Sequence, residues 1–268
     1  MPLLTSPRVV LRTNTLLSVG ALVRFPAILK ITVETPAHFQ EAIRQDYPVY
    51  SLVDANLVPL PDNLPADVQV AVRAAIQNQM GIASPKAHRF VSADGHWTVQ
   101  LSQDYLVLGC NSYPKWETFQ TKLASAFNLL VQEYKPAYAS GTSLRYQNGI
   151  IRSTVALANA PWSRLLGPLT LGVFSDQSIT DDEVTICANQ FELKAPDDVK
   201  VRVRHGLAKV LKTNEPVYTI DNEFSSEQKV ELNHVLAKFD QFHSLSGSLY
   251  RQCISDELFK LLGPVGSQ

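Results

Sequence analysis

The residues best suited to binding a charged partner lie in a strand-like segment at 143–153. Arg145, Tyr146 and Asn148 interrupt an otherwise apolar run, and Arg152 follows at its end. Because successive strand side chains point to opposite faces, we expect Arg145 on one face and Tyr146 with Asn148 on the other. Arg145 could form a two-pronged contact with a carboxylate or phosphate of a ligand. The alternative is structural: an internal ion pair for Arg145 and a buried, hydrogen-bonded Asn148.

A second candidate surface is the alternating segment 199–204, in which Lys200, Arg202 and Arg204 fall on one face of a predicted strand. Further lysines could extend this face: Lys194, Lys209 and Lys212. Such a stripe can follow a nucleic-acid backbone, bind an acidic protein, or remain solvated and prevent aggregation at a sheet edge. No aromatic side chain alternates with the cations, so stacking on single-stranded nucleic acid is not indicated.

One pattern in the chain has the outline of a metal-dependent nuclease. Asp182 is followed by Glu192-Leu193-Lys194, an acid and then E-x-K. Two carboxylates on adjacent strand ends could hold Mg²⁺ while the lysine orients a hydroxide. However, E-x-K is short and arises often by chance, and the acidic run 181–183 suits a turn equally well. We therefore keep Asp182, Glu192 and Lys194 only as an alternative catalytic set.

Neither the histidines nor the cysteines predict a metal site. The six histidines are dispersed; His88 and His96 flank a predicted Asp94-Gly95 turn and could approach each other, but no third ligand is evident. The three cysteines are far apart in the sequence, which gives no disulfide framework and no CxxC site. The sequence also lacks GxSxG, HExxH, Walker and GxGxxG motifs. We expect no metal and no cofactor.

The composition excludes several classes of protein. The 268 residues have a net charge of −1 and are 45% hydrophobic, which is incompatible with disorder and argues against a dedicated nucleic-acid binder. No segment approaches the roughly 18 apolar residues that cross a membrane. The apolar segment at 15–23 is too short for a secretion signal and has no cleavage site. We expect a cytoplasmic protein that makes no membrane contact.

Hydrophobic periodicity predicts the elements that must position these residues. In the first half, we expect strands or a bulged edge strand at 18–34, a helix at 37–46, a helix at 66–80, and a hairpin through Asp94-Gly95. A strand at 105–110 and a helix that begins near Pro114 follow, with one apolar stripe along the helix. The strand at 143–153 completes this half.

The second half should contain four strands, at 169–174, 184–194, 198–210 and 216–222. Ser225 and Gln228 have the spacing of a capping box and predict that a long helix begins there. The fold class is therefore α+β, with antiparallel sheets and helices packed on one face, in two similar halves at 1–160 and 161–268. The halves could be two subdomains or one merged domain.

Two motifs resemble those of a sporadically distributed, uncharacterised prokaryotic family of about this length. Tyr113, Trp116 and Phe119 form a Y-x-x-W-x-x-F helix start, and residues 144–150 form an LRYxNxI strand. Gln147 and Ser143 depart from the family pattern, so the chain resembles a diverged member. The resemblance brings no catalytic residues. It implies an association with mobile or defence-related genes.

These observations favour a non-enzymatic protein that binds a protein partner through Arg145, Tyr146, Asn148, Arg152 and the cationic strand. It could be an accessory subunit of a bacterial defence or toxin–antitoxin-like system. One alternative is a metal-dependent nuclease or nucleic-acid-processing protein, in which the local basic strand contacts nucleic acid. A second alternative is a sensor of small anions or nucleotides, in which Arg145 and Arg152 hold the ligand.

Overall fold

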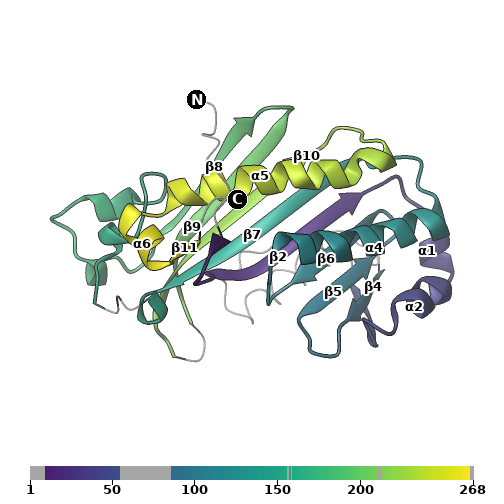
Figure 1. Cartoon of the computed structure of the whole chain (residues 1–268), viewed down its shortest axis with the longest axis horizontal. Helices are drawn as coiled ribbons and strands as arrows, with labels where there is room; N and C mark the ends of the chain where they lie inside the picture. Colours follow the sequence, from purple (N-terminus) through teal and green to yellow (C-terminus); the bar gives the residue numbers. More distant parts are fainter. Residues whose placement is uncertain (1–9, 55–85, 156, 158, 211–212, 266–268) are drawn as a thin grey trace, which may run out of the picture.

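The computed structural model describes residues 10–54, 86–155, 157, 159–210 and 213–265. They form a nine-stranded antiparallel sheet with two long helices on one face, which confirms the α+β class (Figure 1). The strand order is β3-β4-β5-β6-β2-β7-β10-β9-β8, and β1 pairs with β11 in a separate small sheet. The strands are β1 (Val10–Leu11), β2 (Leu16–Arg24), β3 (Val49–Asp54), β4 (Lys86–Val91), β5 (Trp97–Leu101), β6 (Tyr105–Cys110), β7 (Gly141–Ile151), β8 (Ala188–Ala195), β9 (Val199–Lys209), β10 (Pro216–Ser226) and β11 (Pro264–Val265).

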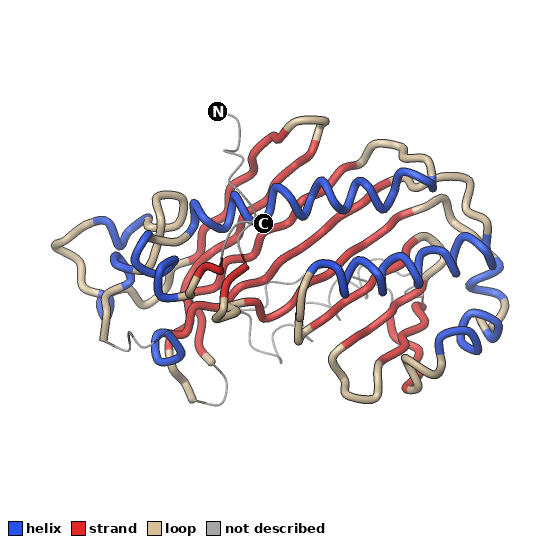
Figure 2. Tube along the Cα trace, viewed as in Figure 1, coloured by secondary structure: helices blue, strands red, loops and turns tan. Residues whose placement is uncertain are grey.

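Two of the helices are long, and Figure 2 shows both on the same side of the sheet. The α-helices are α1 (Lys30–Val33), α2 (Ala37–Ile43), α4 (Trp116–Tyr134), α5 (Val235–Cys253) and α6 (Asp256–Leu261). Short 3₁₀ turns are η1 (Arg152–Val155), η2 (Trp162–Arg164), η3 (Gly172–Ser175), η4 (Asp181–Glu183) and η5 (Leu232–His234). No helix in the described part of the chain combines the length and apolar character needed to cross a membrane.

The apolar stripes of α4 and α5 form the core together with one face of the sheet. The stripe predicted on α4 is confirmed, since Phe119, Leu123 and Leu130 are almost completely buried. Phe239 and Phe242 on α5 are also buried. Burying one such side chain contributes roughly 1.5–3 kcal/mol, so these stripes determine which way each helix faces. The opposite face carries a small apolar cluster around Ala87 and Tyr105 in the first half and mainly charged side chains on β7, β10, β9 and β8.

The two halves of the chain share a central order of elements, to which the first half adds α1, α2 and β3. β2 is followed by the meander β4-β5-β6 and by α4, and β7 is followed by the meander β8-β9-β10 and by α5. In the sheet, β6 lies beside β2 and β10 lies beside β7, while β2 and β7 pair antiparallel at the centre. This arrangement is a pseudo-two-fold repeat about the β2–β7 pair. The sheet is continuous across residue 160, where we expected the halves to divide.

Local turn signals predicted the first meander well. Asp94-Gly95 forms the turn between β4 and β5, and Gly95 has a φ of 74°, a conformation that glycine adopts without strain. β5 alternates between buried and half-buried residues, as its sequence pattern indicates. β6 begins and ends at the expected residues.

Three predictions of local structure were wrong. Residues 18–34 are not two strands or an edge strand, because β2 lies at the sheet centre and α1 follows it. Residues 169–174 form no strand but a loop that enters the 3₁₀ turn η3. Ser225 does not cap a helix, because it pairs with Ser143 and Lys200 on both sides of β10 and so remains in the sheet. α5 begins ten residues later, at Val235.

Two further predictions lie outside the described residues. The helix expected at 66–80 is one of them, and Lys212, which was expected to extend the cationic face, is the other.

One glycine permits a close approach of two chain segments. A Cβ atom added to Gly206 on β9 would lie 2.0 Å from the carbonyl oxygen of Cys187, just before β8. That same carbonyl accepts a hydrogen bond from the amide of Leu207 at 2.9 Å. A side chain at position 206 would therefore force β8 away from β9.

Candidate functional site

The structure brings the two predicted charged surfaces together on one face of the sheet. In the register, Arg145 lies opposite Glu223, Arg204 opposite Asp221, and Arg202 opposite Glu223 and Glu192. Opposite residues share a face, so all these side chains point away from α4 and α5. We call this surface the charged sheet face and define it by Arg145, Glu192, Lys194, Lys200, Arg202, Arg204, Asp221 and Glu223.

Asp221 is the centre of the network on this face. Its carboxylate accepts two hydrogen bonds from Arg145, Nε to Oδ1 at 2.6 Å and Nη2 to Oδ2 at 2.7 Å. Arg204 Nη1 donates to the same Oδ2 at 3.2 Å. The Asp221 side chain is only 9% exposed, so the two guanidinium groups offset the cost of burying its charge. The two-pronged contact expected of Arg145 is therefore made inside the protein.

Glu223 and Glu192 hold the third arginine. Arg202 Nη1 lies 3.4 Å from Glu223 and its Nη2 lies 3.3 Å from Glu192. Arg204 Nη2 approaches Glu223 to 3.9 Å, and Ser143 donates to the same carboxylate at 3.0 Å. The three arginines thus alternate with acids across β7, β10, β9 and β8. Such an alternating network holds its side chains in fixed positions better than isolated surface pairs do.

The lysines of the charged sheet face are less well balanced. Lys194 on β8 lies directly opposite Lys200 on β9. Lys200 lies 3.3 Å from the exposed Glu227, whereas Lys194 has no ion-pair partner among the described residues. Like charges directly opposite each other in a sheet are destabilising. Two like charges therefore lie side by side near the end of the β8–β9 pair, next to the acidic turn residues Asp197 and Asp198.

Tyr146 and Asn148 lie on the other face, beneath the helices, as strand parity predicts. The Tyr146 hydroxyl is 2.8 Å from His243 Nδ1 on α5, and the His243 ring stacks on Trp116 with 4.3 Å between centroids. Trp116 Nε1 in turn donates to Asp240 at 2.9 Å. The helix-start motif and the strand motif behind the family resemblance thus meet at a joint between α4, β7 and α5.

Asn148 has a comparable role at the far end of β7. Its Oδ1 accepts a hydrogen bond from Thr15 at 3.0 Å, and the Thr15 hydroxyl is 2.7 Å from that of Tyr250. Asn148 is 4% exposed. Burial also raises the pKa of the Tyr250 hydroxyl. Tyr146 and Asn148 are accordingly packed in the interior, whereas Arg145 lies on the exposed face.

Arg152 lies apart from the charged sheet face, at the end of β7. Seven residue steps along β7, at roughly 3.3 Å each, place it about 23 Å from Arg145. Its guanidinium donates to Asp181 at 2.8 Å and to the carbonyl of Ala160 at 2.9 Å, and lies 4.6 Å from the Trp162 ring centre. The Arg152 side chain is 16% exposed. The two arginines do not converge on one anion.

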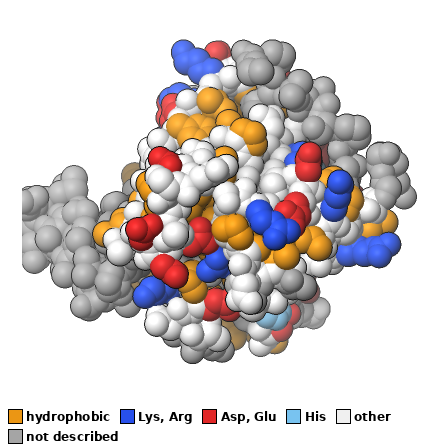
Figure 3. Space-filling model, turned by 90° about the vertical axis from the view of Figure 1, so that its left-hand side faces the viewer, with side chains coloured by type: hydrophobic (Ala, Val, Ile, Leu, Met, Phe, Trp, Pro, Cys, Tyr) orange, Lys and Arg blue, Asp and Glu red, His pale blue; other side chains and the backbone are white. Residues whose placement is uncertain are grey.

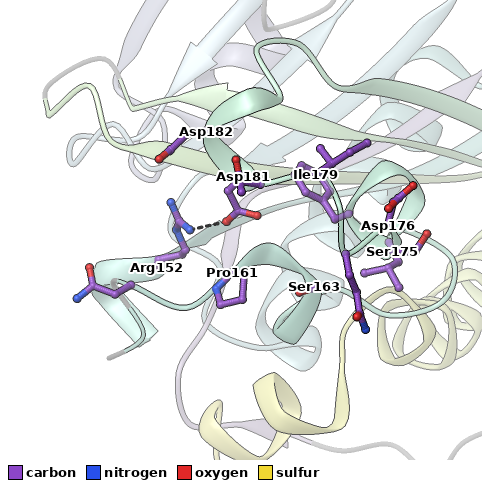
Figure 4. A pocket seen from close by; sticks show the side chains of 13 residues that line it. Arg152, Pro161, Ser163, Ser175, Asp176, Ile179, Asp181 and Asp182 are labelled. Carbon is purple, nitrogen blue, oxygen red and sulfur yellow. Dashed lines mark hydrogen bonds and ion pairs between the residues drawn. The ribbon is translucent and has the colours of Figure 1, made fainter.

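Arg152 and Asp181 border a pocket of about 680 Å³ at this end of the sheet (Figure 4). Asp176 and Asp182 also line it, so three carboxylates face one arginine. Figure 3 shows acidic, basic and apolar side chains interspersed on this end of the molecule. The excess of acids favours a neutral or cationic occupant over an anion.

The structure does not assemble the expected nuclease set. Glu192 and Lys194 share a face of β8, but Glu192 is paired with Arg202. Asp182 lies in η4 and faces the pocket. Within the described ranges, no three His, Cys, Asp or Glu side chains come close enough to hold a metal ion.

Neither a protein-family model nor a curated protein matches the sequence. The resemblance to an uncharacterised prokaryotic family therefore stays a prediction that rests on its two motifs.

The histidines take up separate structural positions. His88 Nδ1 contacts the Tyr50 hydroxyl at 3.1 Å and its Nε2 donates to the carbonyl of Ile31 at 3.2 Å. His205 Nδ1 is 2.7 Å from the Tyr218 hydroxyl. Burial lowers the pKa of both His88 and His205. His96 is hydrogen-bonded to Asn111 rather than directed at His88.

The residues that sequence reasoning missed are the acids of β10. Asp221 and Glu223 have the two-residue spacing of one strand face, and that signal was available in the sequence. The strand was expected to end at residue 222, so Glu223 fell outside it. The pairing of β10 with both β7 and β9 is a long-range feature with no local signature.

Proposed function

We propose that this protein is a non-enzymatic interaction protein and that the charged sheet face is its contact surface for a protein partner with acidic side chains. The observation that carries the proposal is the network of three arginines and three acids on the sheet face opposite the two long helices. Both long helices lie on the opposite side (Figure 1). The ion pairs hold these charged side chains in one arrangement, which favours specific recognition.

The charge balance supports a protein partner rather than a nucleic acid. Five cations occur on this face, against four carboxylates once the neighbouring Glu227 is included, so the net charge is +1. A nucleic-acid surface that neutralises roughly six to ten phosphates needs a much larger positive excess. A face with alternating charges suits a protein partner whose charges also alternate. A partner of one sign would place like charges next to each other, which is repulsive.

The lysine pair indicates where the acidic part of the partner would bind. Lys194 and Lys200 repel each other in the free protein, and an acidic side chain placed between them relieves that repulsion. Relief of this repulsion would add to the free energy of binding, beyond the attraction between the acidic side chain and each lysine. An acidic side chain that reaches the β8–β9 pair between Lys194 and Lys200 fits this arrangement.

The other hypotheses have weaker support. In the nuclease hypothesis the key glutamate already binds an arginine, and in the anion-sensor hypothesis both arginines already bind carboxylates. A role as an accessory subunit in a bacterial defence or toxin–antitoxin-like system follows only from the family resemblance. It agrees with a binding function but adds no residue to it.

The test is a charge reversal that spares the arginine network. Lys194→Glu with Lys200→Glu should raise the Kd for the partner at least about tenfold, and the matched reversal of two exposed lysines elsewhere, Lys30→Glu with Lys260→Glu, should not. Candidate partners would be those recovered from cells with the wild type and the control but not with the double variant. Binding would then be measured with both proteins purified.

Two results would contradict the proposal. One is an equal Kd for the wild type and the Lys194→Glu, Lys200→Glu variant with every purified partner. The other is binding of short DNA or RNA oligonucleotides at physiological salt with a Kd of about 1 μM or below and a steep salt dependence.

A further inference from the structure

The two edges of the sheet are protected to different degrees. On β8, one edge, Glu192 and Lys194 are exposed charges of the kind that discourages pairing with another strand. On β3, the other edge, the exposed side chains are mainly apolar, with Val49 54%, Tyr50 44% and Leu52 53% exposed. Among the described strands, β3 pairs only with β4. Its outer row of backbone N–H and C=O groups is a template for another strand.

We propose that β3 pairs with β3 of a second copy of the chain, antiparallel, about a two-fold axis at Ser51. The sequence Val49-Tyr50-Ser51-Leu52-Val53 is self-complementary in this register. Val49 lies opposite Val53 of the second copy, Tyr50 lies opposite Leu52, and Ser51 lies opposite itself. Every pair then joins side chains of matching character, and β-branched and aromatic pairs of this kind stabilise sheets.

The geometry of strands restricts the choice of register. Opposite residues in an antiparallel pair share a face, so residues of like parity must face each other. Shifting the two strands by two residues in either direction keeps this parity but shortens the overlap. In the proposed register the only charged residue of the strand, Asp54, lies at its end and is already paired with Lys86 of its own chain. No like charges meet across the interface.

A short helix enlarges the apolar surface beside this edge. Leu29, the N-cap of α1, is 69% exposed, and Val33, the last residue of α1, is 82% exposed. The carbonyl of Ile31, between them, accepts a hydrogen bond from His88 on β4, and the Tyr50 ring stacks on His88 with 6.1 Å between centroids. Stable interfaces bury about 1,200–2,000 Å² in total, more than a five-residue strand pair supplies, and this neighbouring apolar surface supplies part of the remainder.

The position of Ser51 on the axis gives a direct test. In the full-length protein, Ser51→Lys and Ser51→Glu each place two like charges opposite each other. The Kd of the dimer should therefore be at least about tenfold higher for each variant alone than for the wild type. An equimolar mixture of the two variants places Lys opposite Glu and should restore the dimer. Sedimentation velocity between about 1 and 100 μM measures this directly. Ser51 is exposed, so both variants should fold.

A substitution at the other edge is the matched control. Gln190→Lys on β8 should leave the dimer unchanged. A wild type that is monomeric over the whole concentration range would overturn the proposal, and so would a dimer that both Ser51 variants leave intact. Failure of the mixture to restore the dimer would overturn the two-fold register at Ser51.

Discussion

Replacement of Asp221 by asparagine should destabilise the protein by about 2 kcal/mol. Breaking a fully buried ion pair costs about 3–5 kcal/mol, and breaking an exposed one costs about 0–1 kcal/mol. Asp221 is 9% exposed, whereas Arg145 and Arg204 are 34% and 30% exposed. Water can therefore reach the arginines but scarcely the carboxylate, which places the expected loss between the two limits. Asparagine keeps the shape but loses the charge and one acceptor oxygen.

Urea unfolding measures the free-energy difference, and a loss of this size corresponds to a fall in Tm of about 4–8 °C. A double-mutant cycle with Arg145→Gln and Asp221→Asn should give a coupling energy of about 1 kcal/mol or more. The control is Glu34→Gln, which breaks an exposed pair with Lys30 and should change stability by less than about 0.5 kcal/mol. If Asp221→Asn changed stability no more than this control, the network would not fix the position of Arg145.

Other substitutions test the packing and the buried titratable groups. Gly206→Ala should lower the free energy of unfolding by about 3 kcal/mol or more, because its Cβ would lie 2.0 Å from a carbonyl oxygen. Gly247→Ala, with open space around it in α5, should instead raise the free energy of unfolding by about 0.5–1 kcal/mol. Equal effects of the two substitutions in thermal unfolding would refute the close approach at Gly206. Because burial lowers the pKa of His88 and His205 below 6.5, unfolding free energy should be greatest above that pH and fall below it by up to about 1.4 kcal/mol per pH unit for each histidine. A free energy that rises on acidification in urea titrations would contradict this sign. Trp116→Phe keeps a ring at the α4–α5 joint but removes a donor to a carboxylate, and should cost about 1–2 kcal/mol in the same assay.

Features that depend on one strand or one helix could be predicted from the sequence. The opposite orientation of Arg145 and Tyr146 follows from strand parity, and the apolar stripe of α4 follows from helical spacing. The turn at Gly95 follows from its residue types. Each of these signals lies within a few residues, so no knowledge of the rest of the chain is needed.

Features that depend on strand pairing could not be predicted in this way. Ser225 and Gln228 have the spacing of a helix cap, but backbone pairing on both sides of β10 keeps Ser225 in the sheet. The cations at 200–204 were visible in the sequence, whereas the acids that bind them arrive from β8 and β10. The partners of Arg145 are likewise about 76–78 residues away in the chain. The candidate surface was therefore found, but its near-neutral charge was not.

The most direct test of the proposed function is photo-crosslinking in living cells from the charged sheet face. A photoreactive amino acid would replace Lys200, which is 45% exposed. In a separate control it would replace Lys30 in α1, in the first half of the chain. We expect one discrete protein adduct from position 200 that is absent from position 30. The absence of a protein adduct from position 200, or its replacement by nucleic-acid adducts, would contradict the proposed protein-binding function.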